Sequence, residues 1–183
     1  APARLGFGTS GDFLKTQGTG ANPVWASAAG GKVGQVVSTT VTAATATTTS
    51  ATYEDIAGMT LDITPVATSS KILVIVNMYN SAGGASYAGH GQIVRDSTAI
   101  CVGDAAGSRT RATFNLRAMH TDRPHVQAMN FLDSPSTTSA TTYKIQWMET
   151  SGTTMYLNRS GDDVDNEHYG RFASTITAME ILA

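Results

Sequence analysis

Acidic residues in the segment 158–171, "NRSGDDVDNEHYGR", come nearest to the spacing of a known chemical site. From Asp163 to Glu167, carboxylates occupy alternate positions, as the ligands of a calcium-binding loop do. The position that requires glycine holds His168, and Ser174 stands where a bidentate acid is needed, which excludes an EF-hand. Two alternatives stay open for this segment: a looser cation site, and a solvated or interface-facing loop.

Other residue types that do chemistry are scattered. The single cysteine, Cys101, cannot form an intramolecular disulfide or a cysteine-based zinc site, and we expect it to be a small buried side chain in a strand. No GxSxG motif is present, and carboxylate pairs drawn from Glu149, Asp162 and Asp163 arise easily by chance. The histidines show no HxxxH or HxH spacing: His90, His120, His125 and His168. We therefore predict no enzyme, no metal site and no cofactor.

Composition narrows the possible partners. Twelve basic and fourteen acidic residues give a net charge of −2 with no basic cluster, which disfavours nucleic acid. No apolar run approaches the roughly 18 residues of a membrane span, so no membrane insertion is expected. The start "APARLGFG" lacks the apolar region of a secretory signal, and Ala1 is interpreted as following a removed initiator Met. Without export, the glycosylation pattern at Asn158 is interpreted as coincidental.

From Val33 onward, short runs of Val, Ile, Thr, Tyr and Phe alternate with turn-forming clusters, which is typical of strands. The segment "SKILVIVNMYN" (70–80) is apolar on both faces and predicts a central strand covered on two sides, with another chain as a candidate cover for one of them. About ten antiparallel strands predict an all-β sandwich, most plausibly a jelly roll, over residues 33–183. Inward side chains are expected at Met59, Leu61, Ile63, Tyr143, Ile145 and Trp147.

Two regions of this domain carry more specific predictions. The segment 90–103 predicts a hairpin that turns near Asp96-Ser97, and alternation over 111–119 predicts a further strand with Phe114 and Ala118 inside. The Thr-rich tract 39–55 fits either a flexible loop or extended β structure. We favour a strand, a loop around residues 46–50 and a second strand from Thr52.

The first 32 residues form a segment of a different kind. Gly, Thr, Asn and Pro separate its apolar side chains, so no helical or strand period joins them into one face. We predict an extended N-terminal arm over residues 1–32 that finds its packing surface on another polypeptide. The side chains expected to anchor it are Leu5, Phe7, Phe13, Leu14, Val24 and Trp25.

Both parts of the chain resemble virion proteins. "GTSGDFLKTQGTGANPVWASA" resembles a segment of tailed-phage fibre and virion surface proteins in which a Gly turn, a Leu-Lys-Thr strand, a second Gly turn and a Trp follow in order. "ITPVATSSKILVIVNMY", "YLNRSGDD" and "STITAMEIL" are similar to phage versions of the trimeric C1q/TNF-like jelly roll. The matching arm residues are Gly8, Ser10, Gly11, Leu14, Thr16, Gly18, Gly20, Pro23, Val24 and Trp25.

The resemblance implies a homotrimer on a virion surface, capsid or tail appendage, made in the host cytoplasm. Its partners would be itself and the major capsid protein or another virion protein. Two versions of this role stay open: capsid decoration or cement, and a short head fibre. No long fibrous shaft lies between the arm and the jelly roll in the sequence, which favours decoration. The alternative is a tail-fibre module that binds a host surface glycan, although aromatics are only 7% of the chain and both Trp are expected to be buried. Its contacts would be the outer-loop residues Tyr87, His90, Tyr156 and Asp163.

Overall fold

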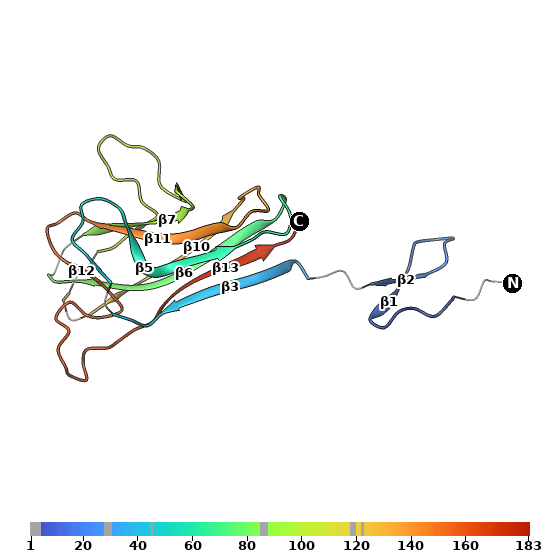
Figure 1. Ribbon diagram of the computed structural model, residues 1–183, viewed down its shortest axis with the longest axis horizontal. Coiled ribbons are helices and arrows are strands. Elements are labelled where there is room, and N and C mark those ends of the chain that lie inside the picture. The colour runs from blue at the N-terminus through green and yellow to red at the C-terminus, as the bar shows by residue number, and fades with distance from the viewer. Residues whose placement is uncertain (1–4, 28–30, 45, 85–87, 118–119, 122) are drawn as a thin grey trace. The chain divides into compact units, whose positions relative to one another are not determined.

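The computed structural model describes residues 5–27, 31–44, 46–84, 88–117, 120–121 and 123–183 (Figure 1). The chain separates into two compact units, residues 1–32 and 33–183, which are described one at a time. All regular structure in the described ranges is β structure, and no helix occurs in them.

Residues 33–183 form two antiparallel sheets that pack as a sandwich (Figure 1). The first sheet runs β3 (Val33–Val41), β13 (Ser174–Ile181), β6 (Lys71–Ala82), β12 (Met155–Leu157) and β4 (Thr47–Thr48), and β10 (His125–Asp133) also pairs with β6. The second runs β5 (Glu54–Ile63), β11 (Thr141–Glu149), β7 (Gly89–Arg95) and β8 (Thr98–Ile100), with β9 (Phe114–Asn115) also paired to β7. Successive long strands alternate between the sheets, as in a jelly roll. The predicted all-β antiparallel sandwich is confirmed.

The core is built by side chains that alternate along the long strands. On β6, Ile72, Val74 and Val76 are fully buried between the sheets, whereas Leu73 and Ile75 on the opposite face are half-buried. The prediction of a central strand is confirmed, and its second face is less covered than expected. The predicted inward residues of β5 and β11 are all buried: Met59, Leu61, Ile63, Tyr143, Ile145 and Trp147.

Several local expectations need correction. Within the expected loop 46–50, the two residues of β4 pair with β12, because β12 would otherwise leave that edge of the sheet unpaired. The next strand begins at Glu54, two residues later than expected. The strand expected over 111–119 is limited to Phe114–Asn115, and Ala118 lies outside the described residues. Cys101 follows β8 in a bend with φ 54° and is only half-buried, so it is not a strand residue.

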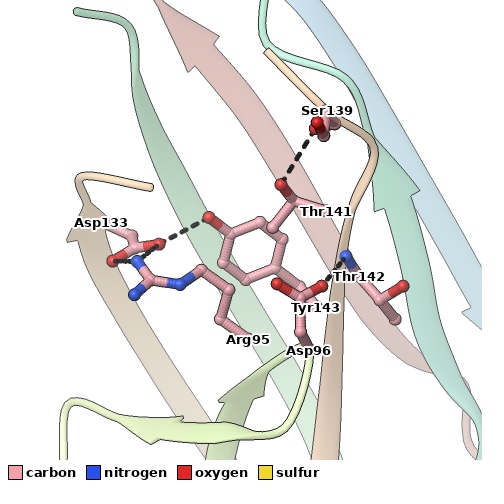
Figure 2. A network of polar contacts seen from close by, with 7 residues as sticks. All are labelled: Arg95, Asp96, Asp133, Ser139, Thr141, Thr142 and Tyr143. Atoms are coloured by element: carbon pink, nitrogen blue, oxygen red, sulfur yellow. Dashed lines mark hydrogen bonds and ion pairs between the residues drawn. The ribbon is translucent and has the colours of Figure 1, made fainter. Parts of the chain in front are cut away.

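A polar network joins the two sheets at one end of the sandwich (Figure 2). Asp133, at the end of β10 in the first sheet, is buried. From the second sheet, Arg95 Nη1 lies 2.8 Å from both of its carboxylate oxygens, and the Tyr143 hydroxyl donates to Oδ2 at 2.6 Å. Burial and the neighbouring Asp133 carboxylate raise the pKa of Tyr143, so its hydroxyl stays protonated as a donor. A buried carboxylate needs such partners, and here they come from the opposite sheet.

The adjacent turn is also held by a side chain. Asp96, with φ 54°, follows β7, and its Oδ1 accepts the backbone N–H of Thr142 at 2.9 Å (Figure 2). Aspartate adopts the left-handed region more readily than most residues, and here its side chain also fixes the turn to β11. The predicted turn at Asp96-Ser97 is confirmed.

Tyr143→Phe should destabilise the sandwich by about 1.5–3 kcal/mol, because it removes a buried hydrogen bond to a charged group. Urea unfolding followed by circular dichroism measures the loss. Tyr53→Phe is the matched control, since the Tyr53 hydroxyl donates to the Arg111 carbonyl at an exposed position. Equal losses in the two variants would show that the Asp133 network contributes nothing special.

Candidate functional site

The first candidate surface is the small unit of residues 1–32. In it, β1 (Asp12–Lys15) and β2 (Val24–Ser27) pair antiparallel, with Leu14 opposite Trp25. Apolar periodicity predicts no strand in this stretch, whereas the resemblance to virion segments implies one at Leu14-Lys15-Thr16. A strand is present over Asp12–Lys15, and its pairing with β2 was not predicted. Glycines at positive φ allow the chain to reverse around the two strands: Gly11, Gly18 and Gly20.

Trp25 organises this hairpin. Its indole Nε1 donates to the Gly6 carbonyl at 2.6 Å. At Gly8, a Cβ would stand 2.6 Å from the Trp25 ring, so this position has no room for a side chain unless the indole moves. Trp25 is nevertheless 41% exposed. The expectation that both Trp residues are buried is correct for Trp147 and wrong for Trp25, because a two-stranded hairpin has no second layer to cover the ring.

The predicted anchoring side chains are mostly on the surface of this unit. Phe7 is 97% exposed, Val24 is half-buried, and Leu5, Phe13, Leu14 and Trp25 are each at least 40% exposed. A hairpin of two strands is at best marginally stable in water. The unit therefore presents an apolar surface that gains stability when it is covered.

The second candidate surface is the outward face of the first sheet. Cross-strand pairing places Leu132, Leu73, Met179 and Val36 in one row across β10, β6, β13 and β3. Leu132 is 48% exposed and Val36 is 55% exposed. The next two rows, both on the side away from Lys71, hold Asn130, Ile75, Thr177, Ser38, Ala128, Asn77, Thr175 and Thr40. These twelve positions, called the outer sheet face below, carry no charged side chain.

The residues predicted as outer-loop ligand contacts do not form one site. Tyr156 and Asp163 come together through Arg159, whose guanidinium lies 3.9 Å from the centre of the Tyr156 ring and 2.6 Å from Asp163. His90 lies on β7 in the other sheet and lines a separate pocket. Tyr87 lies outside the described residues.

Asp163 is engaged in ion pairs rather than open for a ligand. Arg171 pairs with its second oxygen at 2.7 Å. Desolvation alone would raise the pKa of Asp163, but Arg159 and Arg171 hold it below its usual value. Within the described ranges, no group of three His, Cys, Asp or Glu side chains gathers that could hold a metal ion. In segment 158–171, Asp163 is therefore held by Arg159 and Arg171 of the same segment.

Asn158 is a structural residue. Its side chain is fully buried, and Nδ2 donates to the carbonyls of Val41 and Ala43 at 2.6 and 3.2 Å. Its Oδ1 accepts from the Ser174 hydroxyl at 2.5 Å. The amide nitrogen of the glycosylation pattern is therefore enclosed in the fold.

A pocket of about 320 Å³, missed by the sequence analysis, lies beside β7 and β9. Loop 101–113 contributes one wall. The lining includes two arginines and, beside them, an imidazole, a carboxylate and a side-chain amide. The residues concerned are His90, Asp104, Arg109, Arg111, Phe114 and Asn115. Of these residues, only His90 was predicted as a ligand contact from the sequence, because the closure of the loop decides which polar residues meet.

Comparison with known proteins gives a likeness of fold only. No family model and no curated protein matches the chain. Among solved structures, infectious bursal disease virus strain Gt aligns with 94% of this chain and 43% of that one, at 12% identity and a TM-score of 0.48. The VP2 subviral particle of the same virus aligns with 100% and 45%, at 12% identity and a TM-score of 0.42.

The chain thus spans less than half the length of these viral chains. With TM-scores below 0.5, the function has to be argued from this chain's own residues. The described part of the chain contains no helix long and apolar enough to cross a membrane.

Gly8→Val should disrupt the hairpin, because the new side chain would collide with the Trp25 indole and break its bond to Gly6. We expect a red shift of the Trp25 fluorescence, measured in a Trp147→Phe background. Gly6→Ala is the matched control, since a Cβ there meets nothing within 4 Å and the carbonyl acceptor is kept. An unchanged spectrum for Gly8→Val would contradict the described packing of Trp25.

Proposed function

We propose that this protein is a non-enzymatic structural component of a tailed-phage virion surface. It works as a homotrimer of jelly rolls that residues 1–32 anchor to the particle, as capsid decoration or cement or as a short head fibre. The observation that carries the proposal is the hairpin of residues 5–27, whose large apolar side chains stay exposed in a unit too small to bury them.

Covering the hairpin supplies the energy of anchoring. Complete burial of a side chain such as Leu14, Phe13 or Trp25 is worth about 1.5–3 kcal/mol. Several such side chains on one hairpin offset the entropy lost when the glycine-rich segments around it become ordered. A protein surface such as that of a major capsid subunit provides the apolar cover. The resemblance of residues 8–28 to virion segments supports this choice of partner.

The outer sheet face supports the contact between copies. It spans four strands, carries no charged side chain and contains an apolar row. Burying it against another copy therefore requires no charged group to lose its hydration, which keeps the desolvation free energy low. In a cyclic trimer, this face of one copy meets a different patch of the next, and the ring closes after three copies. Such a contact would cover Leu73 and Ile75, which the sandwich leaves half-buried.

Leu132→Glu combined with Val36→Glu should convert the trimer into monomers, because each charge would be buried without a partner in the contact between copies. Light scattering coupled to size exclusion measures the mass. Both positions are at least 48% exposed, so the fold itself should tolerate the change. Thr60→Glu, on the exposed side of β5, is the control and should stay trimeric. A wild-type chain that is monomeric at all concentrations would contradict the proposal.

Removing residues 1–30 should leave a folded trimer that no longer joins particles. The sandwich has its own core, so its thermal midpoint should be little changed. Quantitative mass spectrometry of purified virions measures incorporation, and the number of copies separates the versions. Hundreds of copies per particle indicate decoration, and a few dozen or fewer indicate a fibre. Undiminished incorporation of the shortened chain would refute anchoring by this segment.

A further inference from the structure

The pocket beside β7 and β9 has no part in the assembly proposed above. A bond from the Gly103 N–H to the Ala112 carbonyl, 3.1 Å long, closes loop 101–113 over β7 and β9. Thr113 then fixes the loop to β7, since its backbone N–H donates to the Gly91 carbonyl at 2.8 Å. The volume of about 320 Å³ is at the lower end of the range of small-molecule sites, about 300–1,000 Å³.

Two guanidinium groups are held at this pocket without an acidic partner. Arg111 Nε donates to the Gly103 carbonyl at 2.6 Å, and Arg109 Nη1 donates to the Ala106 carbonyl at 3.2 Å. In the described part of the chain, neither arginine forms an ion pair. The hydrogen bond at Nε orients the Arg111 guanidinium and leaves its two terminal nitrogens, Nη1 and Nη2, for a ligand. Two such parallel N–H donors match the two oxygens of a carboxylate.

The remaining lining residues favour a ligand that also has hydroxyl groups. The Asp104 carboxylate and the Asn115 amide accept no hydrogen bond from any described residue, and both suit sugar hydroxyls. Phe114 adds an apolar wall, and its ring sits over Gly91, where a Cβ would stand 2.0 Å from Cε2. A bare phosphate or sulfate would also gain from the arginines, but it offers Asp104 and Asn115 no ring hydroxyls and Phe114 no apolar face.

We propose that this pocket binds an acidic sugar residue, that is, a sugar with a carboxylate. The carboxylate pairs with Arg109 and Arg111, the hydroxyls bond to Asp104 and Asn115, and the apolar face of the ring lies against Phe114. A host surface glycan could present such a residue to a virion protein. The inference depends on the pocket alone, so it stands or falls separately from the proposed trimer and its anchoring.

The test is saturation-transfer and chemical-shift titration of the full-length protein with D-glucuronic acid and N-acetylneuraminic acid. D-glucose and inorganic phosphate serve as the neutral and the simple anionic probes. We expect saturable binding of at least one acidic sugar, at least tenfold tighter than glucose or phosphate, and weakened by added salt. No binding of either acid, or equal binding of glucose, would overturn the proposal. Equal binding of phosphate would also overturn it, by showing a simple anion site.

Variants then assign the binding to these residues. Arg109→Gln with Arg111→Gln should weaken the acidic sugar at least tenfold, whereas Arg117→Gln, which removes an exposed arginine outside the pocket, should not. If the double variant does not fold, Arg109→Gln alone is decisive, since this exposed side chain bonds only to the nearby Ala106 carbonyl. Wild-type affinity in the Arg109→Gln variant, or an equal loss in Arg117→Gln, would overturn the assignment.

Discussion

Burial of the inward faces of two antiparallel sheets is the interaction on which the rest of the sandwich depends. Because side chains alternate along a strand, fixing which residues of β6, β13 and β11 enter the core also fixes which residues face out. The strand register that fills the core therefore also decides which side chains form the outer sheet face. A shift of β13 by one residue would exchange Ile176 and Ala178 for Thr177 and Met179, and would lose core and face together.

Buried polar side chains then fix the ends of the sandwich. Asp133 receives its partners from the opposite sheet, and Asn158, in the bend after β12, bonds to the end of β3. Glu180 accepts from Gln35 Nε2 and from the Val66 N–H, each at 2.7 Å. Burial alone would raise the pKa of Glu180, but these hydrogen bonds hold it below its usual value. Each group pins a connection that the apolar core would leave free.

The two proposed roles, assembly and ligand binding, use different surfaces of the molecule. Association uses surfaces that are apolar or uncharged, where the gain comes from excluding water. The proposed ligand binding uses loop 101–113. There, backbone carbonyls orient the guanidinium groups of Arg109 and Arg111, which keep further N–H donors for a ligand.

The sequence by itself determined the all-β class, most strand positions and the inward residues of β5 and β11, because alternation and turn residues are local signals. It also indicated an apolar N-terminal segment, but not the hairpin that Trp25 and Gly8 form. Only the tertiary structure decided that Tyr156 and Asp163 share Arg159, that Asn158 is enclosed, and that His90 meets Arg109 and Arg111 at one pocket. These contacts join residues from 3 positions apart, at Tyr156 and Arg159, to 117 apart, at Asn158 and Val41. For the distant pairs, the path of the chain between them is set by sheet packing rather than by any local pattern.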